Sequence, residues 1–253
     1  MFWIFQTTLI LGLGLEAGLL ARGYATGSLK RYAFFYSYIS YVLISEIICA
    51  FVDHLSPANY ASLYWFFLIV RTLAEFGVLW AVSDLIFRPY PLPRVVGRLF
   101  VVTSASAFIL LFWAPQGWTS APSAENFLNL IQLSSLTKSA AIAGIFLAVR
   151  FFQVPLGRNA GGILLGLVTF YSICIVNFAA AMKFGRPIYE NVISWLAPLS
   201  YGFCLTIWLV ALWKLDPVQE MKASANGGIR GGGRDQAVQL RKLGATVTRL
   251  LWK

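Results

Sequence analysis

The chain has 253 residues, of which 58% are hydrophobic and 12% are charged, and its mean hydropathy is +0.71. About 25% of the residues of a soluble domain are charged, so this composition excludes an ordinary water-soluble globular protein. The net charge of +10 arises from basic residues in the loops between apolar segments and in the tail, rather than on a folded domain. We therefore do not expect nucleic acid as a partner.

Seven apolar segments follow one another along the chain, and crossing the hydrocarbon core of a bilayer takes roughly 20 helical residues. They are predicted at residues 2–21, 33–52, 62–87, 99–114, 127–151, 160–182 and 192–213. The fourth is short and the third and fifth contain charges, so six spans are the alternative. The segments are too long and too continuous for the strands of a barrel. The predicted fold class is therefore all-α: a polytopic integral membrane protein with a bundle of seven transmembrane helices over residues 1–214.

Lysine and arginine are distributed unevenly between the two sides of the predicted bundle, and cytoplasmic loops are the ones enriched in both. One side holds sixteen of the twenty basic residues, namely Arg22, Lys30, Arg31, Arg88, Arg94, Arg98, Arg150, Arg158 and the eight from Lys214 onward. The opposite side holds Lys183 and Arg186. We therefore expect the N-terminus outside and the C-terminus in the cytoplasm, with a bacterial inner membrane as the default location.

The tail after the last span has two parts. Residues 215–234 are rich in glycine and are expected to form a flexible linker. On a helix, residues 235–253 would gather their apolar side chains on one face and their basic ones on the other, which is typical of an interfacial helix that binds the anionic cytoplasmic leaflet. The apolar set is Leu240, Leu243, Val247, Leu250 and Leu251, and the basic set is Arg241, Lys242, Arg249 and Lys253. A disordered, solvated tail is the alternative.

Four charged residues fall deep inside the predicted spans: Glu46, Arg71, Glu75 and Lys138. Charges are costly in hydrocarbon and by default mark a functional site. Arg71 and Glu75 are four residues apart, so they lie on one face of their helix. Counted from the outer ends at about 1.5 Å per residue, all four lie roughly 10–20 Å deep. We expect them to form one neutral cluster between the second, third and fifth spans.

The outer half of the fifth span is unusually polar for a membrane helix. Its polar residues are Asn126, Asn129, Gln132, Ser134, Ser135, Thr137, Lys138 and Ser139. Such a surface should not face lipid, and we expect it to line a wet cavity that opens outward, with Tyr171 and Asn177 of the sixth span as neighbours. The alternative is that these groups hydrogen-bond the helices together and serve only the structure.

Two more acidic residues, Glu16 and Asp84, lie near the predicted cytoplasmic boundary. Their carboxylates are expected to reach interfacial water and to need no partner. Two glycine pairs have the small-xxx-small spacing that permits close contact between helices, and we interpret them as packing sites. These pairs are Gly14 with Gly18 and Gly162 with Gly166.

The sequence contains no catalytic or cofactor motif: there is no Gly-x-Ser-x-Gly, His-Glu-x-x-His, Walker loop or Cys-x-x-Cys. The cysteines, Cys49, Cys174 and Cys204, have no metal-ligand spacing and are interpreted as small apolar residues. A single histidine, His54, excludes a bis-histidine haem and the usual multi-histidine metal site. We therefore expect no enzymatic activity, no metal and no cofactor.

Three functional interpretations remain. The favoured one is a sensory or signalling module that binds a small polar or zwitterionic ligand at the charged cluster and reports through its cytoplasmic loops or tail. The alternative is a transporter or channel component that moves an ion, a proton or a small solute. No internal repeat is found, and an odd number of spans does not divide into two equal halves, which disfavours a transporter. The third interpretation is a subunit that assembles with a membrane-protein partner.

Overall fold

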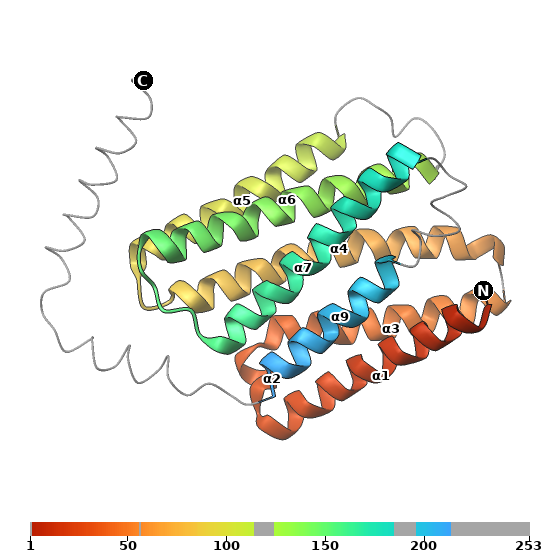
Figure 1. Ribbon diagram of the computed structural model, residues 1–253, viewed down its shortest axis with the longest axis horizontal. Coiled ribbons are helices and arrows are strands. Elements are labelled where there is room, and N and C mark those ends of the chain that lie inside the picture. The colour runs from red at the N-terminus through yellow and green to blue at the C-terminus, as the bar shows by residue number, and fades with distance from the viewer. Residues whose placement is uncertain (1, 56, 114–123, 185–195, 214–253) are drawn as a thin grey trace, which may run out of the picture.

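The computed structural model describes residues 2–55, 57–113, 124–184 and 196–213, and every element in these ranges is a helix (Figure 1). In chain order the helices are α1 (Phe2–Thr26), α2 (Ser28–Arg31), α3 (Ala33–Leu55), α4 (Pro57–Phe87), α5 (Pro91–Trp113), α6 (Ala124–Phe151), α7 (Arg158–Phe184) and α9 (Leu196–Ala211). The linker predicted at 215–234 and the basic tail predicted at 235–253 lie outside the described residues.

Five helices contain a segment that is long and apolar enough to cross a membrane. Within the described residues these segments are Ala33–Val52 in α3, Ser62–Phe87 in α4, Pro91–Leu111 in α5, Leu130–Phe151 in α6 and Arg158–Asn177 in α7. The first two have the predicted bounds. Helix α1 is not among the five, and α9 contains a shorter apolar segment, Pro198–Ala211. The all-α class is confirmed and the multi-pass membrane character is supported, while the count of seven spans stays a prediction.

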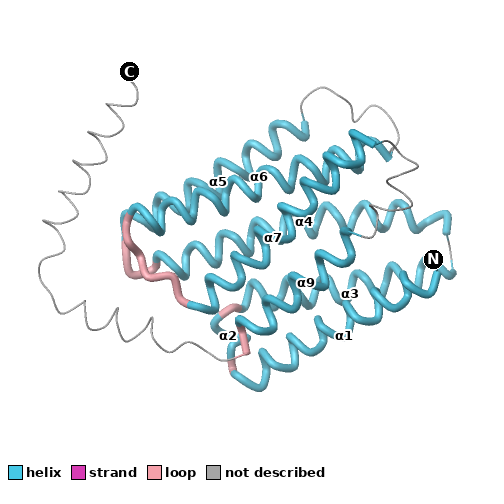
Figure 2. The backbone as a smooth tube through the Cα atoms, in the orientation of Figure 1, coloured by secondary structure: helices cyan, strands magenta, loops and turns pink. Residues whose placement is uncertain are grey.

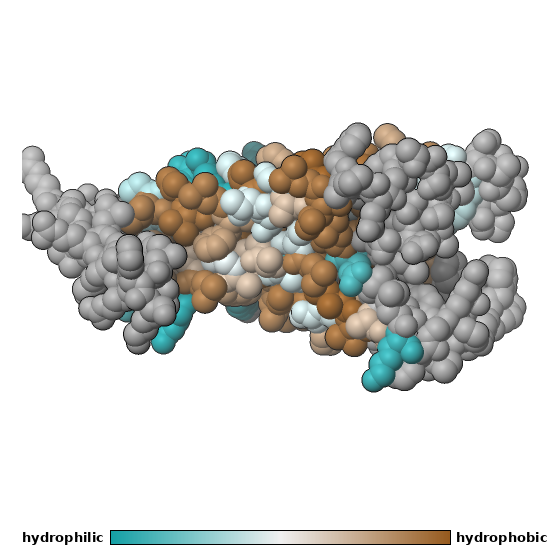
Figure 3. All heavy atoms as spheres, turned by 90° about the horizontal axis from the view of Figure 1, so that it is seen from above, coloured by the Kyte–Doolittle hydropathy of each residue, from teal (hydrophilic) through white to brown (hydrophobic). Residues whose placement is uncertain are grey.

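The flanks of the bundle carry large apolar side chains that no other described helix covers. Leu110 is 71% exposed, Val210 is 67% exposed and Leu147 is 66% exposed. Figure 3 shows such side chains in brown along much of the length of the bundle. Burying apolar surface is worth about 25 cal/mol per Å² in water, so this exposure is unfavourable unless hydrocarbon surrounds it. The surface is therefore suited to lipid.

The helices run alternately in opposite directions and pack around α4 (Figure 2). α4 contacts α3, α5, α6 and α7, and α9 contacts both α1 and α7. This arrangement buries three polar residues of α4, Thr72, Glu75 and Ser83, among other helices. At one end of the bundle the short connections from α1 to α3, from α4 to α5 and from α6 to α7 come together (Figure 1).

Helix α5 begins at Pro91, eight residues before the start predicted for the fourth span. The reason is that the carboxylate of Asp84, whose side chain is 25% exposed, offsets the charges of two arginines. Arg94 Nε and Nη2 donate to the two oxygens of Asp84 at 2.6 and 2.7 Å, and Arg98 Nε donates to Asp84 Oδ1 at 3.0 Å. Charge-assisted, forked contacts of this kind are among the stronger hydrogen bonds, so the helix continues through both arginines. The prediction that Asp84 needs no partner is wrong.

The contact between α7 and α9 depends on two glycines, as predicted. A Cβ on Gly162 would overlap the Cβ of Ala211, and a Cβ on Gly166 would overlap the indole of Trp208. Trp208 is 1% exposed, and its Nε1 donates to the carbonyl oxygen of Ile163 at 3.1 Å. The two helices therefore approach too closely for any side chain at these positions.

The other glycine pair does not pack against another described helix. A Cβ on Gly14 or Gly18 would meet no described atom within 4 Å. Both residues are exposed, as are Ala17 and Ala21 on the same side of α1. Helix α1 packs on α3 and α9 through its other side, which holds the fully buried Leu19. No described residue makes the predicted contact at Gly14 and Gly18, so within the described part of the chain the pair lies on an open face and its role in packing stays a prediction.

Candidate functional site

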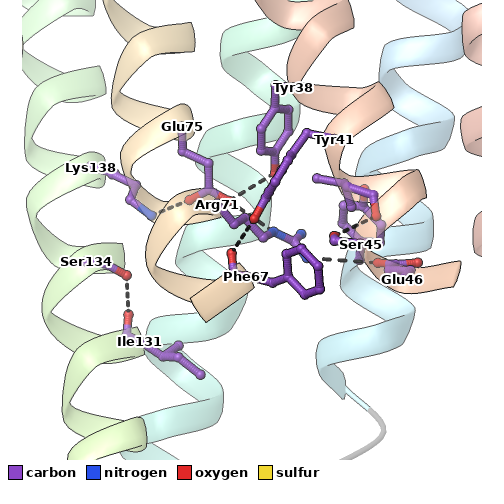
Figure 4. Close-up of polar contacts among 12 residues, drawn as sticks. Tyr38, Tyr41, Ser45, Glu46, Phe67, Arg71, Glu75, Ile131, Ser134 and Lys138 are labelled. Carbon is purple, nitrogen blue, oxygen red and sulfur yellow. Dashed lines mark hydrogen bonds and ion pairs between the residues drawn. The ribbon is translucent and has the colours of Figure 1, made fainter. Parts of the chain in front are cut away.

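The core of the site is an ion pair between two helices. Lys138 of α6 donates to Oε2 of Glu75 on α4, and the two side chains are 2% and 5% exposed. The other oxygen of Glu75, Oε1, accepts from the Tyr38 hydroxyl of α3 at 3.0 Å and from Arg71 Nε at 3.4 Å. Both carboxylate oxygens are therefore satisfied, which is the condition under which a buried charge is tolerated. We call Lys138, Glu75 and Tyr38 the closed pair region (Figure 4).

The second half of the site is looser. Arg71 Nη1 lies 3.9 Å from Oε1 of Glu46, and the two side chains are 23% and 25% exposed. The guanidinium also lies over the ring of Tyr201 of α9, 5.0 Å from its centroid. In Figure 4, Arg71 extends from α4 toward Glu46 on α3, with Tyr41 beside it. We call Arg71 and Glu46 the open pair, because the two groups are too far apart for a close hydrogen bond and both side chains are partly exposed.

Two aromatic rings lie beside the ammonium group of Lys138. Its Nζ lies 5.7 Å from the ring centroid of Phe76 and 5.1 Å from that of Tyr171. Contacts of this kind are worth about 2 kcal/mol when the cation is removed from water. Tyr171 of α7 therefore neighbours the cluster, as expected.

Asn177 does not join the four charged residues. It is 5% exposed on α7, and its Oδ1 accepts no hydrogen bond within the described part of the chain. Asn177 was predicted as a site residue because it is polar and lies inside a predicted span. The structure leaves it as a separate buried amide, six residues along α7 from Tyr171.

Glu16 belongs to the site although the sequence did not predict it. It is fully buried, and its Oε1 accepts a hydrogen bond from the hydroxyl of Tyr201. Its Oε2 has no partner among the described residues, and the charges acting on it come from Glu46 and Arg71. The expectation of interfacial water at Glu16 is wrong because α1 continues to Thr26, which puts Glu16 about 15 Å from that end of the helix.

The polar groups of α1, α3, α4, α6 and α9 thus form one layer across the bundle. It runs from Lys138 through Glu75 and Arg71 to Glu46, and Tyr201 links Arg71 to Glu16. The four charged residues predicted to lie together do so in the structure. These four contribute two acidic and two basic groups, and Glu16 adds a third acidic residue to the layer, so the neutrality of the cluster stays a prediction.

Sequence reasoning also missed the hydroxyl groups of the layer. Tyr38 donates to Glu75, Tyr201 donates to Glu16, and Tyr41 donates to the carbonyl of Phe67 at 2.9 Å. Tyrosine is common near membrane interfaces, so its presence in a span carries little signal. One signal was available: Tyr38 and Tyr41 lie on the same helix as Glu46, with spacings of three to eight residues that fit one side of a helix.

No family model, no curated protein and no solved structure matches this chain. Within the described residues, no group of three or more histidine, cysteine, aspartate or glutamate side chains is placed to hold a metal ion. The three cysteines are free thiols. The chemistry open to the site is therefore that of the charged layer itself.

Proposed function

We propose that the chain is a multi-pass membrane protein that binds a small polar or zwitterionic ligand at the open pair and acts as a sensory or signalling module. One observation carries the proposal. Arg71 and Glu46 are 3.9 Å apart and about a quarter exposed, although both lie in segments suited to hydrocarbon. A charge facing lipid at this depth costs several kcal/mol, whereas a charge facing a wet, ligand-accessible space does not.

The chemistry of the open pair fits a ligand that carries both charges. A guanidinium group binds a carboxylate through two parallel hydrogen bonds, and a carboxylate binds an ammonium group. A zwitterion would replace the weak contact between Arg71 and Glu46 with two stronger ones. Glu75 holds Arg71 through Nε, and Lys138 in turn holds Glu75. The closed pair region then positions Arg71 and does not itself bind the ligand.

The proposal includes the topology expected from the sequence: seven spans with α1 and α9 as the first and last, the N-terminus outside, and the basic end of the bundle in the cytoplasm of a bacterial inner membrane. Support comes from the connections that meet at one end in Figure 1, which carry Lys30, Arg31, Arg88 and Arg158. A reagent that cannot cross the bilayer would then reach the open pair from outside.

Thermal unfolding in detergent tests ligand binding, with the standard amino acids as zwitterionic probes. A probe present at about 100 times its Kd should stabilise the protein by about 2.7 kcal/mol. This corresponds to a rise in Tm of roughly 5–10 °C for a domain of this size. The variants R71Q and E46Q should lose the rise.

The matched control is R150Q, which removes an exposed arginine at the far end of α6 and should keep the full rise in Tm. An equal rise in R71Q and in the parent chain would contradict binding at the open pair. A flat response to every zwitterion would contradict the proposed ligand class.

A transporter or channel component is the second candidate. The observation that favours it is the buried carboxyl group of Glu16. A third carboxylate beside two cations, with one oxygen unpartnered among the described atoms, is the kind of group that carries a coupling proton or cation. Uptake of the stabilising zwitterion into proteoliposomes under a proton gradient, abolished in E16Q, would favour transport. Binding without uptake would favour the sensory module.

A further inference from the structure

A pocket of about 120 Å³ lies at the basic end of the bundle, away from the charged layer. Its walls are residues 31–35, where α2 ends and α3 begins, and Ala81, Val82 and Leu85 near the end of α4. The pocket opens to the surface between α3 and α4, two helices with segments that can cross a membrane. It therefore lies where the end of a lipid molecule would meet the protein.

The lining combines one cation with an apolar wall. Arg31 supplies the charge among the described residues that line the pocket, and the side chains of Val82 and Leu85 supply apolar surface. Phe34 is 64% exposed beside the opening and extends the apolar surface outward. Lys30 and Arg88, both exposed, flank the two walls in sequence and add positive charge at the same end.

We propose that this pocket binds an anionic phospholipid, with the phosphate on Arg31 and an acyl chain along Phe34 and Leu85. A guanidinium group binds phosphate oxygens in a forked geometry. Basic pockets between membrane helices on the cytoplasmic side suit acidic headgroups. A soluble phosphate would use the cation and leave the apolar wall without a function. The site is independent of the open pair, so it stands whether or not a zwitterion binds there.

Native mass spectrometry of the purified protein with added phosphatidylglycerol or phosphatidylcholine tests the proposal. The parent chain should retain phosphatidylglycerol in preference to phosphatidylcholine. Losing a charge-assisted hydrogen bond should weaken phosphatidylglycerol binding in R31Q by about tenfold to a hundredfold. R150Q removes an exposed arginine at the same end, so it should lose at most about fivefold, the diffuse attraction of one charge.

A second variant keeps the test sharp if R31Q folds poorly. A81F places an aromatic ring in the pocket and leaves every charge in place, so it should also lose phosphatidylglycerol. Equal losses in R31Q and R150Q would overturn the proposal in favour of diffuse attraction to the basic end. Equal retention of phosphatidylcholine would overturn the role of the headgroup charge. Displacement of the lipid by inorganic phosphate alone would overturn the role of the apolar wall.

Discussion

The variant Lys138→Ala is expected to unfold with a free energy about 3–5 kcal/mol below that of the parent chain. The loss arises because Glu75 stays buried at 5% side-chain exposure after its cation is removed. Arg71 and Tyr38 still reach the other carboxylate oxygen, but at 3.4 and 3.0 Å they cannot replace the contact at Oε2. Thermal or denaturant unfolding in detergent measures the loss.

A double-mutant cycle identifies its cause. If the pair is coupled, Lys138→Ala/Glu75→Ala should lose less than the sum of the two single variants, because the second substitution removes the orphaned charge. Lys30→Ala makes the same chemical change at an exposed position and should alter stability by no more than about 0.5 kcal/mol. Strictly additive losses in the cycle would show that Lys138 and Glu75 are not a buried pair.

The second large effect is expected at the contact between α7 and α9. Gly162→Ala should destabilise the protein by about 1–3 kcal/mol, because its Cβ overlaps that of Ala211 and the helices must separate to admit it. Separation would also strain the hydrogen bond from Trp208 to Ile163. The substitution adds one methyl group and no charge, so a loss of stability would report the packing of α7 against α9. Thermal unfolding in detergent measures it.

Gly18→Ala is the matched control, because a Cβ there meets no described atom within 4 Å. Alanine is the better helix former by up to about 1 kcal/mol, so this variant should be neutral or more stable. A destabilised Gly18→Ala would mean that α1 is covered by another chain in the assembled protein. A neutral Gly162→Ala would contradict the close approach of α7 and α9.

The sequence predicted the helices that form the centre of the bundle, because their apolar segments are long enough to cross a bilayer despite the charges within them. The segments Ala33–Val52 and Ser62–Phe87 have the predicted bounds. The start of α5 could not be predicted, because it depends on Asp84, a residue of the preceding helix that meets Arg94 and Arg98 only after folding. Hydropathy treats each charge separately, whereas the cost of a charge depends on its partner.

The candidate site shows the same division between local and tertiary information. Arg71 and Glu75 could be paired from their spacing on one helix, and similar depths brought Lys138 to them. Glu16 could not be assigned to the site from the sequence, because its partner Tyr201 lies 185 residues further along the chain and no local pattern predicts that contact. Asn177 was included for its polarity alone, and polarity does not specify which neighbours a side chain meets.

The two halves of the charged layer differ in burial and in hydrogen bonding. The closed pair region is buried and both carboxylate oxygens of Glu75 are hydrogen-bonded, so it holds α4 and α6 together and fixes Arg71. The open pair keeps its two groups 3.9 Å apart and partly exposed, and under the proposed function a ligand would compete for them without breaking the core. Charged groups held in place by a second set of hydrogen bonds are the arrangement that binding sites use.

Cysteine accessibility tests the central claim, that Glu46 faces water inside the membrane, most directly. In a background with Cys49, Cys174 and Cys204 replaced by alanine, Glu46→Cys is compared with Ile44→Cys, which lies on the same helix and is 55% exposed on its apolar side. A charged thiol reagent that cannot cross the bilayer is added to intact cells. The account predicts that Glu46→Cys is modified from outside while Ile44→Cys is not, because thiolates form in water and not in lipid. Equal resistance at both positions would place Glu46 against hydrocarbon and contradict the account.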